Sequence, residues 1–478
     1  VGITTVSLAK YAIDRGTSSG PVFVAVGLFV AASNFRFGPK PELFSLCGLA
    51  SLLLVLHMVD RSRRWKLLFA VPILVLIWAW LHRGSTVSLP VLGAAMVVWG
   101  LRRDTRPLAW AALASLILTL GALLLTPGMA GSLASAGSVV STSAYTQYIG
   151  EWQPLTLDAL WSTMPLLAVL TVLWALLAPA QRRLHFGTLV VLGLGFMAVR
   201  HVRFVPLFAL AMVPEVAWGL SRLLERHRDA LARQVRPAVL SGLLVAGAIG
   251  AISWPYLNRD VRTWGAGVHD FHRPEDAAAF LAKHPPPGRM FNTFNYGGYL
   301  LYALGPKQKV FIDGRNDQVY TPDFFAQSAV TPGNNQILAQ LVETYDVSYA
   351  VLQCTMMATS SYLWLYQNPE WRLVYLDDKA AIVVKQSEGS LSYLDQHAYH
   401  ELSPDTALDR ARFPKQDPRR AQFSADVLRH VAQSPHSLRA HYLAALVHRN
   451  EGRHSAYIEE RDKVAELAAK RGLEVALP

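Results

Sequence analysis

Residues 42–59 have the sequence ELFSLCGLASLLLVLHMV, and this stretch decides the class of fold. After Glu42 it contains no Lys, Arg, Asp or Glu, and an apolar run of this length is typical of a helix that crosses a bilayer. Residues 3–13 are expected to be the end of a further helix. Comparable apolar runs occupy residues 20–33, 67–82, 85–101, 108–126, 161–179, 185–199, 202–220 and 238–255. The sequence therefore predicts a polytopic transmembrane domain over residues 1–255, with about nine to ten helices, the first of them partial.

The composition indicates two environments in one chain. Of the 478 residues, 52% are hydrophobic and only 17% are charged, which is too apolar for a wholly soluble protein. The second half mixes charge, proline and short apolar runs, as a water-soluble domain does. The net charge of +11 could suggest nucleic acid as a partner. Many arginines lie in short loops between apolar runs, however, so membrane topology explains the charge better, and no nucleic acid is expected.

The basic residues divide unequally between alternate loops. One set of loops, together with Lys10 and Arg15, holds sixteen Lys and Arg residues, whereas the other set holds five. The longest loop of the second set, residues 127–160, has no Lys or Arg. The positive-inside rule makes the first set cytoplasmic. A crossing through 238–255 then places the C-terminal region in the periplasm of a multi-pass protein of the bacterial inner membrane.

Ionisable residues on the predicted outer face are candidates for a binding site, because charge near a bilayer is costly unless it meets water, a partner or an anionic ligand. Arg and His side chains there could bind a lipid-linked phosphate through charge-assisted hydrogen bonds. The alternative is that these arginines extend toward the interface and have no other role. Glu151 is the candidate acid or base. The candidate phosphate ligands are Arg36, His82, Arg83, Arg200, His201 and Arg203.

Five motifs occur in a fixed order along the chain. They are Lys40-Pro-Glu-Leu-Phe-Ser45, Trp78-Ala-Trp-Leu-His-Arg83, Tyr148-Ile-Gly-Glu-Trp-Gln-Pro154, Arg200-His-Val-Arg-Phe-Val-Pro-Leu-Phe208, and a block from Phe291-Asn-Thr-Phe-Asn-Tyr-Gly-Gly-Tyr299 to Val310-Phe-Ile-Asp-Gly-Arg315. Together they resemble bacterial integral membrane glycosyltransferases of the GT-C type, akin to dolichyl-phosphate-mannose mannosyltransferases. The resemblance covers roughly residues 3–385 and depends on the ordered set.

That resemblance implies sugar transfer from a polyprenyl-phosphate donor to an acceptor on the outer face, with inversion at the anomeric carbon. In GT-C enzymes the activating carboxylate usually lies in the first outer loop, and this chain is expected to begin downstream of that helix and its acidic loop. The alternative function is therefore a non-catalytic, degenerate GT-C-like subunit of a membrane assembly. No metal ligand set is evident; a divalent metal remains open as a cofactor.

From residue 273 the pattern predicts an extracytoplasmic α/β domain over 256–385. Helices are expected at 274–284 and 335–345, and strands at 289–293, 309–312, 349–353, 372–376 and 380–385. Two adjacent glycines, Gly297 and Gly298, indicate a close backbone approach or a helix start. Asp313, Arg315 and Asp317 follow a predicted strand and are candidates for an acceptor site. The alternative is an Asp-Gly turn held by a structural ion pair.

The end of the chain is predicted to be helical. A charged, proline-punctuated linker is expected over 386–420, followed by a short tail over 421–478 that resembles a tetratricopeptide repeat, with Gly452 at its turn. So few repeats are not expected to be stable alone, and the tail should pack on its neighbour or on a protein partner. The expected partners are thus the lipid bilayer, a polyprenyl-phosphate-linked sugar, and a protein at the tail.

Overall fold

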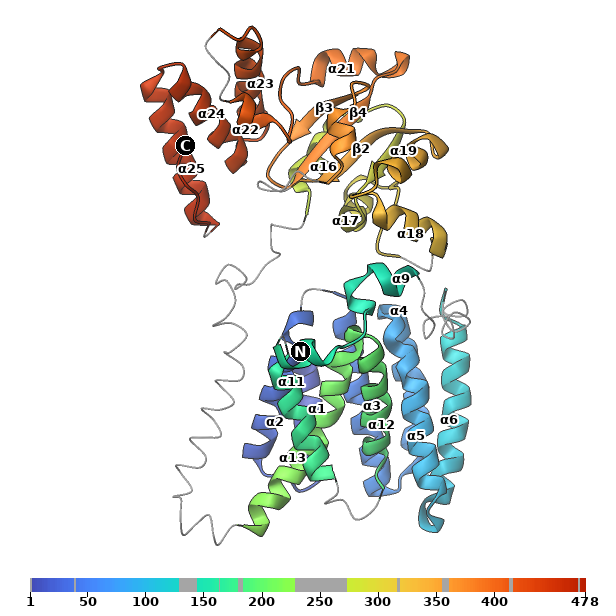
Figure 1. Cartoon of the computed structure of the whole chain (residues 1–478). Helices are drawn as coiled ribbons and strands as arrows, with labels where there is room; N and C mark the ends of the chain where they lie inside the picture. Colours follow the sequence, from blue (N-terminus) through green and yellow to red (C-terminus); the bar gives the residue numbers. More distant parts are fainter. Residues whose placement is uncertain are drawn as a thin grey trace. The chain divides into compact units, whose positions relative to one another are not determined.

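The computed structural model describes residues 2–37, 40–128, 144–162, 164–178, 184–227, 273–315, 319–354, 361–411, 416–471 and 473–478. The chain divides into two compact units, Val1–Asp260 and Val261–Pro478. Figure 1 shows the first unit as a helical bundle and the second as a small sheet with helices around it. The predicted crossing at 238–255 lies outside the described residues.

The helical unit follows the apolar runs of the sequence closely. Its elements are α1 (Gly2–Asp14), α2 (Ser19–Ser33), η1 (Asn34–Arg36), α3 (Glu42–Ser62), η2 (Trp65–Phe69), α4 (Ala70–Leu81), η3 (Arg83–Val87), α5 (Ser88–Gly100), η4 (Arg103–Thr105), α6 (Arg106–Leu124), α9 (Ala144–Tyr148), η5 (Gly150–Trp152), α10 (Leu157–Ser162), α11 (Pro165–Leu177), α12 (Phe186–Arg200), η7 (Val202–Phe204) and α13 (Val205–Arg226). Predicted run 161–179 is divided between α10 and α11.

Three helical segments in the described part of the chain are long and apolar enough to cross a bilayer. They are Glu42–Ser62, Arg103–Leu124 and Val202–Arg226. Shorter apolar helices occupy Ser19–Ser33, Trp65–Leu81, Pro165–Leu177 and Phe186–Arg200. Large apolar side chains also remain exposed on the helices, Trp110 at 72% and Ile73 at 63% among them. Such outward-facing apolar residues suit lipid rather than water, so the first unit is that of a membrane protein.

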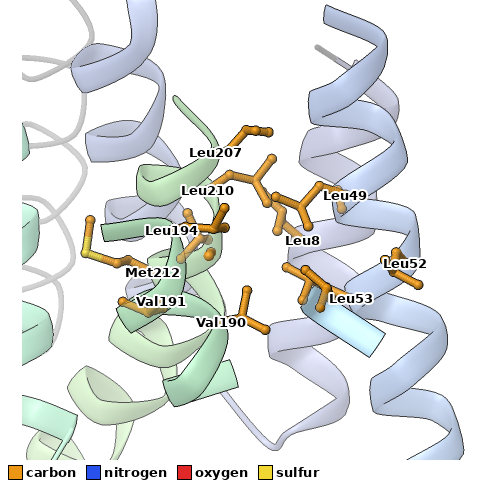
Figure 2. Packing of buried hydrophobic residues seen from close by; sticks show 14 of the residues in the cluster. Leu8, Leu49, Leu52, Leu53, Val190, Val191, Leu194, Leu207, Leu210 and Met212 are labelled. Atoms are coloured by element: carbon orange, nitrogen blue, oxygen red, sulfur yellow. The ribbon is translucent and has the colours of Figure 1, made fainter. Parts of the chain in front are cut away.

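The core of the bundle is built from leucine and valine on facing helices. Figure 2 shows Leu8 of α1 and Leu49 of α3 gathered with Leu210 of α13, and Leu53 directed toward Val190 of α12. α13 lies at the centre of this packing, because nearly every residue from Val205 to Ala217 is buried. A helix that is apolar on all sides is expected where other helices surround it.

A buried ion pair joins α1 to α13. The guanidinium Nη1 of Arg15 donates to Oε1 of Glu215 at 2.7 Å, and the side chain of Glu215 is 2% exposed. Arg15 also lies 5.2 Å from the ring centroid of Trp218, on the same helix as Glu215. A charge inside an apolar bundle is tolerated when its partner is present. This pair therefore fixes the end of α1 against α13.

The second unit has a four-stranded sheet with the order β1-β2-β4-β3. β1 (Arg289–Asn292) runs parallel to β2 (Val347–Gln353), while β4 (Ala380–Lys385) runs antiparallel to both β2 and β3 (Trp371–Leu376). Its helices are α16 (Glu275–Lys283), α17 (Phe294–Leu304), α18 (Pro322–Val330), α19 (Asn335–Thr344), α20 (Leu363–Gln367), η11 (Glu388–Ser390), α21 (Leu391–His397), α22 (Ala407–Arg410), α23 (Arg419–Gln433), α24 (Leu438–Asn450) and α25 (His454–Lys470).

Alternate residues of the strands pack on opposite faces of the sheet. Tyr349 and Val351 of β2 belong to a core shared with α16 and α17, whereas Ala350 and Leu352 belong to one shared with α19, α23 and α24. A period of two residues is what a sheet covered on both faces requires. The expected strand at 309–312 is not formed. The side chain of Asn292 instead bonds the backbone N–H of Phe311 at 2.7 Å and the carbonyl of Ile312 at 2.8 Å.

Residues 386–420, expected as a linker, contain η11, α21 and α22 and contribute to the core. Tyr399 and Leu402 are 2% and 3% exposed and pack with β3 and α23. The tail forms the hairpin α24–α25, and Gly452 lies at its turn with a φ of 75°, as predicted. The tail packs on its neighbour, because it shares the apolar core of the sheet.

Candidate functional site

The predicted outer loops come together where three turns between helices meet. The backbone N–H of Val202 donates to the carbonyl of Gln153 at 2.9 Å, and the N–H of Leu155 donates to the carbonyl of Val199 at 3.0 Å. These two bonds attach the loop after η5 to the turn between α12 and α13. The side chains carried by η5 and η7 are thereby held beside η1 and the start of α3.

Arg36 is the centre of this meeting point. Its guanidinium donates to the carboxylates of both Glu42 and Glu151, and only 9% of its side chain is exposed. Arg203 lies 3.9 Å from Glu42 and places its guanidinium 4.2 Å from the ring centroid of Trp152. These five residues, Arg36, Glu42, Glu151, Trp152 and Arg203, are called the Arg36 cluster below.

The cluster keeps Glu151 ionised. Burial by itself would raise the pKa of Glu151, but the hydrogen bond and charge of Arg36, with further contributions from Arg203 and Lys40, bring it below its usual range. A carboxylate of this kind accepts hydrogen bonds at neutral pH. It is correspondingly a weak base.

Two buried hydrogen-bond donors of the cluster lack an acceptor among the described residues. The Nε of Arg36 and the Nε1 of Trp152 are buried and have no hydrogen-bond partner among the described residues. A buried donor without an acceptor costs about 1–3 kcal/mol. These two donors of the cluster can therefore bind a water molecule or a ligand that is rich in oxygen acceptors.

Both predicted histidines lie next to the cluster. The Nδ1–H of His201 donates to the backbone carbonyl of Trp152 at 2.7 Å, and the two rings meet edge to face. His82 lies within electrostatic range of Arg36, Glu42 and Arg203. The first unit therefore brings together residues that the sequence separates by more than a hundred positions.

The remaining two predicted arginines differ in their placement. Arg83 follows His82 in η3, and its charge also reaches that histidine. Arg200 is exposed, and its guanidinium lies 5.7 Å from the ring centroid of Phe196, one turn earlier on α12. Arg200 is thus stacked on its own helix, away from the contacts that define the Arg36 cluster.

The predicted acceptor site lies in the second unit and is organised around Asp313. The carboxylate accepts hydrogen bonds from the backbone N–H and guanidinium of Arg315 and from the hydroxyl of Tyr320. Burial would raise the pKa of Asp313, but the bonds from Arg315 lower it overall. This geometry favours a structural turn for Asp313 and leaves Arg315 half exposed. Asp317 lies outside the described residues.

Two members of the cluster were missed as site residues. Glu42 lies within a motif that the sequence singles out and only six residues from Arg36, yet nothing local indicates that it also approaches Arg203. Trp152 also lies within a quoted motif, but nothing in the sequence indicates that Arg203 stacks on the face of its ring. Across the described ranges, no group of three or more His, Cys, Asp or Glu side chains is arranged to hold a metal ion.

Comparisons with known proteins give little further information. No protein-family model matches the chain, and a search of curated proteins gave no match. Among solved structures, the chain is similar to a mutant of the arabinofuranosyltransferase AftD from Mycobacteria, determined by cryo-electron microscopy, with 14% sequence identity and a TM-score of 0.46. The alignment covers 81% of this chain and 34% of AftD, so the chain spans about a third of the length of that protein.

Proposed function

We propose that this protein is a membrane glycosyltransferase that moves a sugar from a polyprenyl-phosphate donor to an acceptor on the extracytoplasmic face. The observation that carries the proposal is the Arg36 cluster, which gathers charged and aromatic side chains from loops on one predicted side of the membrane. The order of the five motifs supports the same class, because it resembles that of GT-C enzymes.

The charge balance of the site suits an anionic ligand. Arg36, Arg203 and Lys40 carry three positive charges, whereas the two carboxylates of the Arg36 cluster carry two negative charges. The site keeps a net positive charge even when every internal ion pair is formed. Guanidinium groups bind phosphate oxygens in bidentate fashion, so Arg203 and Arg83 are assigned to the phosphate of the donor.

The proposed reaction needs a group that orients the acceptor hydroxyl. Glu151, ionised and 27% exposed, can accept the hydrogen bond of that hydroxyl. Because its lowered pKa makes it a weak base, it takes up the proton only as the hydroxyl oxygen bonds to the anomeric carbon and becomes acidic. The hydroxyl oxygen bonds to the anomeric carbon as the bond from that carbon to the phosphate oxygen breaks. The polyprenyl phosphate leaves as an anion, which Arg203 and Arg83 stabilise.

The function is tested with the full chain in lipid nanodiscs and a panel of polyprenyl-phosphate sugars that includes polyprenyl-phosphate mannose. The wild type should release polyprenyl phosphate when an acceptor is present. Arg203→Ala should reduce the rate by about a hundredfold or more, the usual effect of losing one group that stabilises developing charge. Arg103→Ala is the matched control, because Arg103 is exposed in a predicted cytoplasmic loop.

The same experiment distinguishes a glycosyltransferase from a non-catalytic subunit, the two functions that the sequence allows. A wild-type chain that neither transfers a sugar nor binds the lipid phosphate contradicts the proposal. If such a chain instead copurifies with a protein partner at fixed stoichiometry, the non-catalytic subunit becomes the better description. Equal activity in Arg203→Ala and the wild type would remove the Arg36 cluster from the mechanism.

A further inference from the structure

A second group of polar side chains lies beside the Arg36 cluster and joins α3, α4 and η3. The indole Nε1 of Trp78 donates to Oγ of Ser45 at 2.9 Å, and that Oγ lies 2.6 Å from Nδ1 of His82. The backbone N–H of Gly84 also donates to Nδ1 of His82, at 3.1 Å. The three contacts form a continuous chain from α4, through α3, to the histidine.

The directions of these bonds fix where the protons are. An indole N–H and a backbone N–H can only donate, so Ser45 accepts from Trp78, and Nδ1 of His82 accepts from Gly84. Because Nδ1 must keep its lone pair, the short contact to Ser45 has the serine hydroxyl as donor. His82 is therefore neutral, and its ring proton is on Nε2.

Close packing keeps the ring in this orientation. A Cβ atom at Gly84 would lie 2.2 Å from Oγ of Ser45, and one at Gly48 would lie 2.3 Å from Cδ2 of Trp78. Only glycine leaves room for the contacts at these two positions. Turning the imidazole over would place a carbon where Nδ1 is and leave two donors without an acceptor, which would cost about 1–3 kcal/mol for each.

The nearby His201 has the opposite arrangement. Its Nδ1 lies 2.7 Å from a carbonyl oxygen, which can only accept, so Nδ1 carries a proton. The two histidines next to the Arg36 cluster thus differ, since Nδ1 of His82 accepts hydrogen bonds and Nδ1 of His201 donates one.

We propose that His82 is an uncharged hydrogen-bond donor to a phosphate oxygen of the ligand, and that Ser45 is the positioning residue that fixes its tautomer. This inference rests on the proposed function. A neutral donor strengthens phosphate binding without adding to the charge of Arg36, Arg83 and Arg203, which lie within electrostatic range. It also cannot give up a proton easily to the departing phosphate.

The first experiment is nitrogen NMR on the full chain in nanodiscs, with ¹⁵N-labelled histidine and the His82 signals assigned by their loss in His82→Gln. At neutral pH, Nδ1 of His82 should have the signature of an unprotonated nitrogen and Nε2 that of a protonated one. Addition of farnesyl phosphate should shift the Nε2 proton downfield, whereas farnesol, which lacks the phosphate, should not.

Three results would overturn the inference, and they are distinguishable. A proton on Nδ1 contradicts the tautomer. Farnesyl phosphate that binds without moving the Nε2 signal contradicts the contact but leaves the proposed function intact. A wild type that does not bind farnesyl phosphate at all contradicts the proposed function together with the ligand assigned to His82.

Substitutions distinguish the positioning of the His82 ring from a general loss of folding. His82→Ala should weaken the binding of farnesyl phosphate by about tenfold to a hundredfold, the usual loss for one hydrogen bond to a charged group. Ser45→Ala should keep the imidazole but give a mixture of tautomers, with weaker binding. Ser51→Ala, on the same helix, is the control and should behave as the wild type. A single unchanged tautomer in Ser45→Ala would refute the role of Ser45.

Discussion

Glu215 illustrates, at the scale of single residues, how a charge is kept inside the helical unit. It is 3% exposed on α13, after Pro214, and Arg15 reaches it from the end of α1. The sequence around Glu215 contains nothing that indicates its partner, because the two residues are 200 positions apart. Pairing of this kind depends on the fold and cannot be predicted from local pattern.

Replacing Glu215 should therefore destabilise the bundle strongly. Glu215→Ala leaves the guanidinium of Arg15 buried without its carboxylate, and the expected loss in unfolding free energy is about 3 kcal/mol or more. Thermal unfolding of the full chain in detergent measures it. Glu225→Ala is the control, because Glu225 is exposed near the end of the same helix and pairs with Arg222 at the surface. Equal melting temperatures for the two variants would contradict this account.

His430 gives the second unit a pH dependence. The residue is 0% exposed, neither ring nitrogen has a hydrogen-bond partner among the described residues, and burial lowers its pKa from about 6.5 to about 3. Between these values the unfolded chain binds a proton that the folded chain does not. Stability should therefore fall as the pH decreases below about 6.5, by about 1.4 kcal/mol per pH unit from this group.

Scanning calorimetry of the full chain at pH 7.0 and 5.5 tests this effect. His430→Leu should reduce the difference in melting temperature of the second unit between the two conditions. His436→Leu, at an exposed position three residues beyond α23, should keep the difference seen in the wild type. If His430→Leu and the wild type lose the same stability on acidification, the buried neutral histidine is not the cause.

At the residue scale, the sequence signal used was a basic residue that opposes the predicted membrane topology. Arg36 and Arg203 were singled out because few basic residues occur on the predicted outer side, and both belong to the Arg36 cluster. Arg200 has the same sequence signal but stacks on Phe196. This sequence signal identifies the loop but not which of its arginines reaches the cluster, because Arg200 ends α12 whereas Arg203 lies in η7.

At the scale of elements, α17 packs on the segment 309–312 through a glycine. A Cβ atom at Gly297 would lie 1.9 Å from the carbonyl oxygen of Ile312, whereas one at Gly298 would have no neighbour within 4 Å. The sequence prediction of a close backbone approach is confirmed at Gly297. The strand expected beside it is absent because the side chain of Asn292 replaces the strand pairing.

Alanine at the two glycines should have opposite effects. Gly297→Ala should lower the stability of the second unit by about 1–3 kcal/mol, because the helix must move away from Ile312. Gly298→Ala should be neutral or stabilise the unit by about 0.5–1 kcal/mol, since alanine favours a helix. Thermal unfolding of both variants measures these effects. If Gly298→Ala is destabilising and Gly297→Ala is neutral, the close packing of Gly297 on Ile312 is contradicted.

The apolar runs predicted most helices of the first unit because a membrane-spanning helix has a strong compositional signal. Strands of the second unit were harder to distinguish. Residues 309–312 and β4 are both short apolar runs, and only β4 forms ladders, with β2 and β3. Which short run finds a partner depends on the arrangement of the other strands.

At the scale of the whole molecule, Asp378 joins the helical tail to the sheet. Its carboxylate accepts from the backbone N–H of Leu438 at 2.6 Å and of Arg439 at 2.8 Å, which are the first two residues of α24. It also accepts from Nη1 of Arg471 at 2.6 Å, just after α25. Its role at the start of α24 depends on a helix 60 residues away in the sequence, so local pattern does not indicate it.

Removal of this carboxylate should loosen the tail. Asp378→Ala leaves the backbone N–H groups at the start of α24 without their carboxylate acceptor and Arg471 without its partner, and the expected cost is about 1–3 kcal/mol. Hydrogen exchange in α24 and α25 should accelerate while exchange in the bundle stays unchanged. Asp462→Ala, an exposed position on α25, should leave the exchange of both helices as in the wild type. If hydrogen exchange in α24 and α25 is as slow in Asp378→Ala as in the wild type, Asp378 does not have this role.

The predicted division of the chain differs from the observed one in the region 386–420. Proline and charge suggested a linker, but Tyr399 and Leu402 are buried between the sheet and α23. The composition of this region does not show that its short helices pack on the sheet and α23 through a few large side chains. The tail and the sheet consequently belong to one unit. A tetratricopeptide-like pattern by itself does not indicate that the tail shares a core with the sheet.

The most direct test of the central claim is the affinity of the full chain in nanodiscs for farnesyl phosphate, compared with farnesol. The account predicts saturable binding of the phosphate, weakening at high salt and reduced about tenfold or more in Arg203→Ala, with no change in Arg103→Ala. Binding of farnesol as tight as that of farnesyl phosphate, or affinity that does not depend on Arg203, would contradict a phosphate site at the Arg36 cluster.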